Sequence, residues 1–167
     1  HLHTRLAADG KTILAHNPYS AEFADQVAFS SMFLVPDSEA DTQRSIPSRL
    51  DAHEATNQAI SRSFTCDRVE FIGRNRSLKR PAAMDRQYLS GTLGSGLDPC
   101  AAIQLTFSLE AGQEQTMVMV LGSMSRDTTY LDTAIAGVCH HHAASASLDA
   151  VHQMWKDTTA VMQAQTP

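Results

Sequence analysis

The chain has 167 residues, of which 43% are hydrophobic, and a formal net charge of −5 at pH 7. This length suits one compact domain, and the hydrophobic fraction is that of a globular protein rather than a disordered one. The acidic balance excludes nucleic acid as a partner, since the only cluster of basic residues in the sequence is short and consists of Arg74, Arg76, Lys79 and Arg80.

The cysteines and the lengths of the apolar runs indicate the cellular compartment of the chain. Cys66, Cys100 and Cys139 are odd in number and far apart, which argues against a disulfide framework and indicates a reducing environment. No stretch approaches the roughly 20 consecutive apolar residues of a membrane helix. We therefore expect a cytoplasmic location.

The start of the chain predicts a β-hairpin. Apolar and polar residues alternate over 2–6, and a second strand-like run covers 12–15. The pair Asp9–Gly10 lies between them and favours a tight hairpin turn, because both residues tolerate positive φ angles. A further alternating run over 27–33 predicts a third strand.

The middle of the chain has weaker periodicity. The sequence is polar from 36 to 62 and predicts an exposed loop, with a short helix over 51–60. Strand character returns at 68–72 and again just before Gly91.

The most regular strands are predicted over 103–109 and 117–121. The first alternates in polarity, as in a sheet with one wet face, whereas the second is apolar on both faces, as in a strand covered on both sides. With a turn at 110–114, we expect these two strands to be neighbours.

Beyond Gly122 the sequence becomes alanine-rich and predicts one or two helices. One covers 131–138, and another begins at Ser147 as its N-cap. The second helix has an apolar stripe that we expect to pack on the sheet, namely Leu148, Val151, Trp155 and Met162. The fold class predicted is mainly β and antiparallel, with a β-sandwich over 1–125 and a helical linker over 126–167 that packs on it.

Three segments carry a family resemblance. They are TCDRVEFIGRN at 65–75, PAA at 81–83 and LSGTLGSGLDPCAA at 89–102. In order and spacing these segments resemble the supersandwich domain of glycoside hydrolase family ninety-four and of cyclic β-1,2-glucan synthases. The block at 98–102 is the most specific part of the match. The residues around Asn17–Tyr19 also resemble the family's approach to this region.

The resemblance implies an antiparallel β-supersandwich, complete or partial, with C-terminal helices. In that family such a domain precedes an (α/α)₆ barrel, and the catalytic residues belong to the barrel. The implied function is a non-catalytic accessory domain of a bacterial β-glucan-processing enzyme, either cytoplasmic or the cytoplasmic part of an inner-membrane enzyme. The partners implied are the barrel, a β-glucan chain and a second copy in a homodimer, with no cofactor.

Candidate contact residues for a carbohydrate or for the neighbouring domain follow from the motifs and from aromatic side chains in loop-like contexts. We expect no catalytic residue and no metal ligand in the chain. The candidates are Arg68, Arg74, Asp98, Tyr19 and Tyr88.

Two motifs that resemble binding sites have simpler explanations. The glycines at 91, 94 and 96 are followed by Pro99 rather than by a helix, so tight turns are favoured over a phosphate-binding loop. Cys139 is followed by three histidines, but consecutive helical residues point in different directions and do not converge on one metal ion.

The carboxylates also have a structural explanation. Asp67 and Glu70 lie three positions apart in a predicted strand, on opposite faces, and so do not form a catalytic pair. We expect Asp67 or Glu70 to pair with Arg68, Arg74 or Arg86 and so to tie strands together. Two alternatives to the scaffold remain open, a carbohydrate-binding module and a complete enzyme, either a mutarotase-like epimerase or a lyase. The second needs a convergent histidine or glutamate pair, which the sequence does not show.

Overall fold

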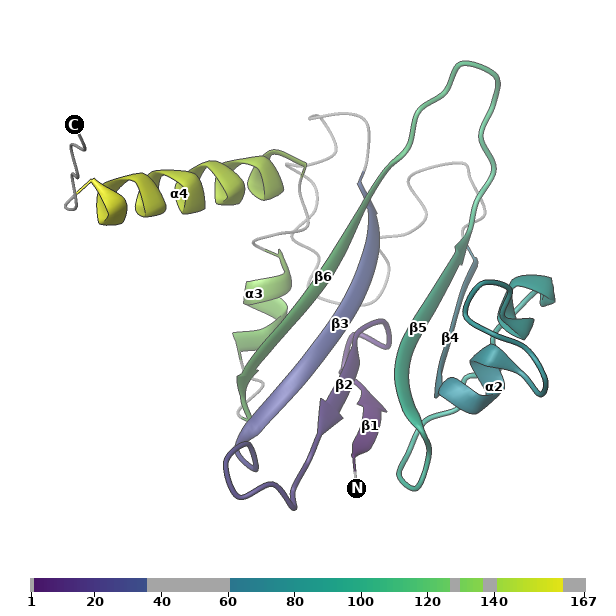
Figure 1. Ribbon diagram of the computed structural model, residues 1–167. Coiled ribbons are helices and arrows are strands. Elements are labelled where there is room, and N and C mark those ends of the chain that lie inside the picture. Colours follow the sequence, from purple (N-terminus) through teal and green to yellow (C-terminus); the bar gives the residue numbers. More distant parts are fainter. Residues whose placement is uncertain (1, 36–60, 127–129, 137–140, 161–167) are drawn as a thin grey trace, which may run out of the picture.

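The computed structural model describes residues 2–35, 61–126, 130–136 and 141–160. Within these residues the strands form two antiparallel sheets, one ordered β1-β2-β3-β6 and one consisting of β4 and β5 (Figure 1). The strands are β1 His3–Leu6, β2 Ile13–His16, β3 Gln26–Val35, β4 Ser61–Asp67, β5 Pro99–Thr106 and β6 Thr116–Ser125. This arrangement confirms the predicted fold class.

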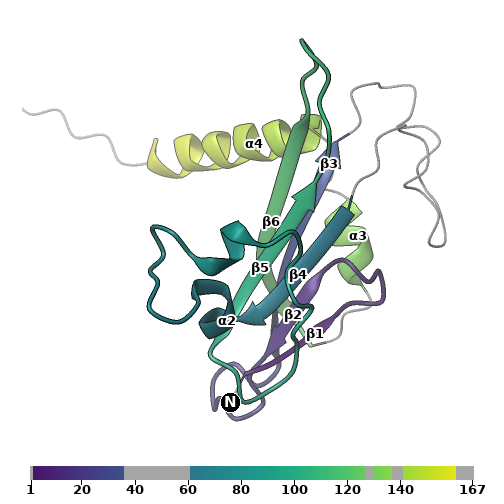
Figure 2. The same cartoon turned by 90° about the vertical axis from the view of Figure 1, so that its right-hand side faces the viewer.

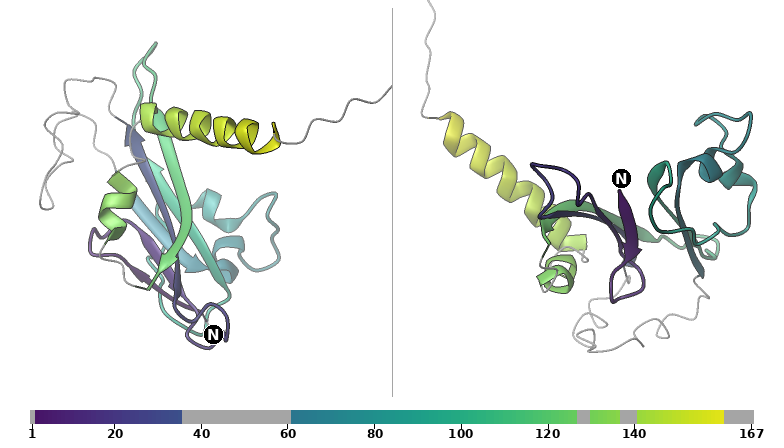
Figure 3. Two further views of the ribbon diagram at one scale, coloured as in Figure 1. Left: turned by 90° about the vertical axis from the view of Figure 1, so that its left-hand side faces the viewer. Right: turned by 90° about the horizontal axis from the view of Figure 1, so that it is seen from below.

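Helices flank the two sheets. They are α2 Arg68–Ile72, the 3₁₀ helix η1 Ala82–Asp85, α3 Leu131–Ala136 and α4 His141–Thr159. Seen from the side and from below, α3 lies on one side of the four-stranded sheet and the β4–β5 pair with α2 on the other (Figures 2 and 3). The long helix α4 extends away from both sheets (Figure 1).

The predicted N-terminal hairpin is confirmed as β1 and β2, with Leu6 opposite Ile13. Its turn is wider than a two-residue turn, since the Ala7 N–H donates to the Thr12 carbonyl at 2.8 Å. Only Gly10 takes a positive φ, of 64°. Asp9 instead accepts hydrogen bonds from the backbone N–H groups of Lys11 and Thr12 through Oδ1, which fixes the turn from within.

The hydrophobic core lies between the four-stranded sheet and α3. Leu14 and Val27 are buried on neighbouring strands, and Leu131 of α3 joins them in one cluster with Ala7. Positions two apart along a strand share a face, so β2 and β3 each direct every second residue to this core. The aromatic rings of Phe29 and Phe33 pack against it.

A short extended segment joins the two sheets. The Gly91 N–H donates to the Phe64 carbonyl at 2.8 Å, and the Cys66 N–H donates to the Thr92 carbonyl at 2.9 Å, so the segment runs beside β4. Two residues later, Thr4 of β1 and Gly94 exchange backbone hydrogen bonds of 2.9 and 3.1 Å. Residues 91–94 therefore link β4 of one sheet to β1 of the other.

The strand predicted at 68–72 is wrong, because these residues form α2. The alternation of Val69 and Phe71 imitates a strand, but Asp67 caps a helix by accepting hydrogen bonds from the N–H groups of Val69 and Glu70. The strand expected before Gly91 is also wrong, since η1 and irregular backbone precede this glycine.

The predicted strands at 103–109 and 117–121 exist as β5 and β6, but their expected pairing is wrong. β5 pairs with β4, and β6 pairs with β3 over ten residues from Gln26↔Ser125 to Val35↔Thr116. The expected double coverage of β6 is wrong as well, because Met117, Met119 and Leu121 are exposed. Alternating strands show which faces are apolar but not which strand lies beside them.

The helices differ from the prediction at their ends and in their packing. The first is confirmed as α3, while Val138 lies outside the described residues. The second begins at His141, so Ser147 lies inside α4 and is not its N-cap. Trp155 was expected to pack on the sheet but is 57% exposed. Met162, Cys139 and the predicted helix at 51–60 lie outside the described residues, and Ser61–Arg62, expected in the loop, belong to β4.

Candidate functional site

Arg68 and Asp98 form a bidentate ion pair across the region that carries the motifs. Arg68 Nε donates to Asp98 Oδ2 at 2.9 Å and Nη2 donates to Oδ1 at 2.8 Å. The backbone N–H of Arg68 also donates to the Asp98 carbonyl at 2.8 Å. Three bonds thus fix the start of α2 to the residue that precedes β5, and both side chains remain exposed.

Glu70 is the centre of a second polar cluster. Its Oε2 accepts hydrogen bonds from the hydroxyls of Thr65 at 3.0 Å, Thr92 at 3.1 Å and Ser90. Its Oε1 accepts a hydrogen bond from Arg86 Nη1 at 2.6 Å. The carboxylate therefore ties α2 to β4 and to the 90–92 segment. Of the carboxylate–arginine pairs that the sequence left open for Asp67 and Glu70, the structure forms the one between Glu70 and Arg86.

The environment lowers the pKa of Glu70. Partial burial by itself raises this pKa, but the hydrogen bonds from Ser90, Thr65 and Thr92 and the charge of Arg86 together outweigh that effect. A carboxylate with both oxygens occupied by donors is held in its charged form. Glu70 is thus organised as a structural anion and not as a general acid, which requires a raised pKa.

The next motif segment packs on the end of α2. Gly73 ends this helix with φ 82° and ψ 157°, and a Cβ placed there would lie 2.5 Å from the Cβ of Ala82. Arg76 and Asp85 form an exposed ion pair nearby, whose hydrogen bond and charge lower the pKa of Asp85. Arg74 is exposed and forms no ion pair with any residue that the structure describes.

The two candidate tyrosines lie in separate parts of the molecule. Tyr19 belongs to the connection between β2 and β3, is 73% exposed, and stacks on His3 with ring centroids 6.5 Å apart. Tyr88 follows η1 and is also exposed. Of the five candidate contact residues, the structure joins Arg68 to Asp98 through direct bonds. Neither Tyr19 nor Tyr88 lines either of two cavities found among the described residues.

An apolar crevice opens between the two sheets, with a volume of about 280 Å³. Arg68 is its one charged lining residue, and the other side chains come from β3, β5, β6, α2 and the segment that follows α2. They are Met32, Phe71, Leu78, Cys100, Ala101, Ala102, Ile103 and Met119.

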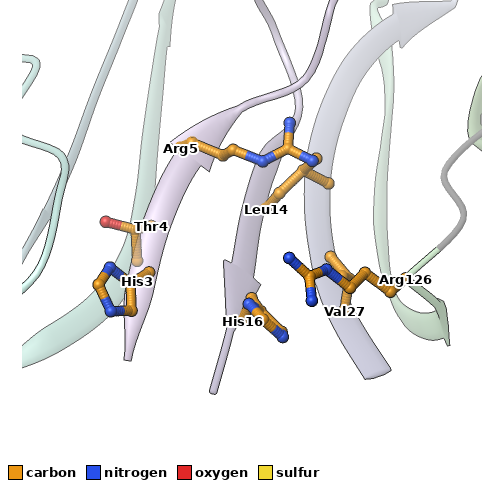
Figure 4. A pocket seen from close by; sticks show the side chains of 7 residues that line it. All are labelled: His3, Thr4, Arg5, Leu14, His16, Val27 and Arg126. Atoms are coloured by element: carbon orange, nitrogen blue, oxygen red, sulfur yellow. The ribbon is translucent and has the colours of Figure 1, made fainter. Parts of the chain in front are cut away.

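A second cavity, of about 340 Å³, lies on the face of the four-stranded sheet near its N-terminal edge (Figure 4). Leu14 and Val27 line it next to the core, with the backbone of β1 at one side. The remaining lining residues are polar or basic, namely His3, Thr4, Arg5, His16 and Arg126. None of the described residues that line the cavity is acidic.

The described cysteines are not reactive thiols. Cys66 is fully buried, and this burial raises its pKa. Burial, with smaller contributions from Cys66 and Asp67, raises the pKa of Cys100 to about 11. Both thiols are therefore protonated at neutral pH. In the part of the chain that the structure describes, no three His, Cys, Asp or Glu side chains gather as metal ligands.

Comparison with known families gives a match to the glycosyl hydrolase 94 supersandwich domain over residues 1–153. The chain belongs to this family. Two antiparallel sheets linked by residues 91–94 are consistent with that assignment. The supersandwich resemblance of the three motif segments is thereby confirmed.

A curated relative of the supersandwich chain is the cyclic β-(1,2)-glucan synthase NdvB of Rhizobium meliloti (strain 1021), which is 27% identical over 158 residues. The match covers 94% of this chain but 5% of the relative. The chain therefore spans a small part of the length of this relative.

Sequence reasoning missed two groupings. The hydroxyls around Glu70 come from separate segments, and no local pattern indicates that they meet. The basic residues of the sheet cavity were predictable in part. Once the hairpin register is known, the two-residue period of a strand places His3, Arg5 and His16 on one face of the sheet. Arg126 joins them through the long-range pairing of β6, which local periodicity does not reveal.

Proposed function

We propose that the chain is an accessory domain of a longer β-glucan-processing enzyme, with no catalytic residues of its own, and that it supports the catalytic domain. Membership of the glycosyl hydrolase 94 supersandwich family supports this proposal, as does the likeness to a cyclic β-(1,2)-glucan synthase. The division into a sandwich over 1–125 and a helical linker over 126–167 is part of the same proposal.

The observation that carries the proposal is an uncovered apolar surface on β6. Met117, Met119 and Leu121 alternate along one face of this strand, and Leu121 is 76% exposed. β6 pairs only with β3 among the described strands, so its other edge also has unpaired backbone groups. Apolar faces and open edges of this kind are typical of surfaces that another unit covers.

The helix α4 presents a second uncovered apolar surface. Every described side chain on it is exposed, and its large apolar residues fall at helical spacing, Leu148, Val151, Met154 and Trp155. A helix of this length gains most of its stability from packing of such a face. In the described chain no element covers it (Figure 1).

The proposed occupant of both surfaces is the (α/α)₆ barrel of the same parent protein. The length of the relative leaves ample chain for such a domain, since the match covers 5% of it. A homodimer would cover the same surfaces with a second copy, and the test below separates the two. The free thiols Cys66 and Cys100 suit the reducing cytoplasm, which is the proposed location.

Trp155→Ser tests the scaffold in the isolated chain and in the parent protein. In the isolated chain the indole is exposed, so we expect the free energy of unfolding to change by less than about 0.5 kcal/mol. In the parent, loss of a buried interface tryptophan should cost about 2 kcal/mol or more of stability. Met84→Ser, at an exposed apolar position on η1, is the matched control and should change neither.

Two results would contradict this account. One is equal destabilisation of the isolated chain and the parent, which would place Trp155 in the chain's own core. The other is a stable dimer of the isolated chain that Trp155→Ser dissociates, which would make a second copy the occupant.

The alternative of a carbohydrate-binding module has weaker support. A sugar platform requires exposed aromatic faces that act together, whereas Tyr19 and Tyr88 lie on different connections. Although both side chains are exposed, Arg68 and Asp98 use their hydrogen-bonding groups on each other. Calorimetric titration of the isolated chain with β-1,2- and β-1,4-gluco-oligosaccharides separates the two functions. Saturable binding heat in the wild type, lost in Arg74→Ala or in Tyr88→Ala, would favour sugar binding over scaffolding.

A further inference from the structure

The cavity on the four-stranded sheet gathers basic side chains on an acidic protein. The chain has a net charge of −5, yet His3, Arg5, His16 and Arg126 all line this one cavity of about 340 Å³. The Arg5 and Arg126 guanidinium groups both extend over the strands that form its floor (Figure 4). Such a concentration produces a local positive potential that favours an anion.

The two arginines are available to a ligand. Neither forms an ion pair with any residue that the structure describes. Arg5 Nη1 donates one hydrogen bond, to the Leu6 carbonyl at 3.3 Å, which leaves most of its donors free. A guanidinium carries five N–H donors in a planar fork that matches the oxygens of a phosphoryl group.

Several of the lining residues are held in place by the fold. His16 Nε2 donates to the Ala24 carbonyl at 2.8 Å, which fixes the orientation of its imidazole. The backbone N–H of Arg126 donates to the Asp25 carbonyl at 2.6 Å, so this residue is anchored beside the start of β3. The buried Leu14 and Val27 complete the cavity with an apolar surface. The His16 imidazole, the Arg126 backbone and the apolar floor are therefore fixed by the fold, and the two guanidinium groups extend over them.

We propose that this cavity binds a phosphoryl group, supplied either by inorganic phosphate or by a hexose phosphate. The volume lies at the small end of ligand sites and suits a ligand of this size. Tyr19 stacks on His3, which lines the cavity, and offers an exposed aromatic face to a sugar ring. The inference is independent of the scaffold, because it concerns the sheet face opposite the one that carries Met119.

The test is a titration of the 167-residue chain, followed by NMR amide shifts, with inorganic phosphate, glucose 6-phosphate, glucose and sodium chloride at matched ionic strength. We expect saturable shifts around His3, His16 and Arg126 with one or both phosphates and none with glucose or chloride. Equal affinity for both phosphates identifies the phosphoryl group alone as the ligand. Tighter binding of glucose 6-phosphate, reduced by Tyr19→Ala, identifies the sugar phosphate.

Variants assign the binding to this cavity. Arg126→Gln should weaken phosphate binding roughly tenfold or more, since it removes a charge-assisted hydrogen bond. It keeps the backbone bond to Asp25, so the chain should fold as before. Arg5→Gln should act in the same direction, and Arg74→Gln, an exposed arginine outside the cavity, should have no effect. Shifts equal to those of chloride, or affinity unchanged in Arg126→Gln, would overturn the proposal.

Discussion

Arg68 and Asp98, thirty positions apart in the sequence, meet in two side-chain hydrogen bonds of 2.9 and 2.8 Å and one backbone bond of 2.8 Å. This pair joins the two longest motif segments and fixes the start of α2 against the start of β5. Both residues therefore have a structural partner, which explains their place in the motif without any ligand.

A double-mutant cycle measures how much this pair contributes. Because the two side chains are 53% and 39% exposed, solvent screens the attraction, and we expect a coupling energy of about 0.5 to 1 kcal/mol. The measurement is urea unfolding, followed by circular dichroism, of Arg68→Ala, Asp98→Ala and the double variant. Arg74→Ala is the control and should not couple to Asp98→Ala. A coupling energy of zero between Arg68 and Asp98 would refute the pair.

Gly73→Ala should be the most damaging single substitution in the motif region. The backbone at φ 82° and ψ 157° belongs to a region that only glycine occupies readily, and the new Cβ would lie 2.5 Å from Ala82. We expect a loss of about 2 to 4 kcal/mol in the free energy of unfolding. Gly112→Ala is the matched control, since its φ is 83° but no atom lies within 4 Å, and its loss should be clearly smaller. Equal losses would show that the contact with Ala82 is unimportant.

Local signals in the sequence predicted the strands well where the pattern is strictly alternating, as in β1, β3 and β5. They failed at α2, because the alternation of Val69 and Phe71 fits a strand and a short capped helix equally. The neighbour of β6 was not predictable, since pairing over ten positions with β3 depends on contacts between residues about ninety positions apart. Apolar stripes indicate that a surface is to be covered but not what covers it, which explains the error at Trp155.

The site was predictable to a smaller extent. The motif match indicated Arg68 and Asp98, and their pairing with each other follows from the fold alone. The hydroxyls that surround Glu70 come from Thr65, Ser90 and Thr92, which are ordinary residues in the sequence and become a cluster only when residues 90–92 lie beside β4.

Glu70 should make stability depend on pH. Its pKa in the folded state is lower than the ordinary value of 4.5, so the folded state favours the charged form. The contribution of Glu70 to the free energy of unfolding is complete above its pKa in the unfolded state, and it is lost as the pH falls through its pKa in the folded state. Glu70→Gln should therefore destabilise the chain by about 1 to 2 kcal/mol at neutral pH and by less in acid. Unfolding in urea from roughly pH 7 to pH 3 measures this difference.

The control for this series is Glu114→Gln, at an exposed position with no ion pair among the described residues. It should leave the slope of stability against pH unchanged. A wild-type slope that persists in Glu70→Gln would assign the acid sensitivity to another carboxylate.

Cys100 should react slowly with iodoacetamide. A pKa raised from 9.0 to about 11 leaves roughly a hundredfold less thiolate near pH 8, and the thiolate is the reactive form. We expect the alkylation rate, followed by peptide mass spectrometry with glutathione as the reference thiol, to rise about tenfold per pH unit up to roughly pH 10. A plateau near pH 9 would mean that burial does not shift this thiol.

The central claim, that another domain covers α4 and the open face of β6, is tested most directly by amide hydrogen exchange. We would compare the isolated chain with the parent protein, using the β3 amides as an internal reference, because these lie within the four-stranded sheet in both. The account predicts that the amides of α4 exchange rapidly in the isolated chain and become protected in the parent. Equal exchange of α4 in the two proteins, with β3 protected in both, would contradict it.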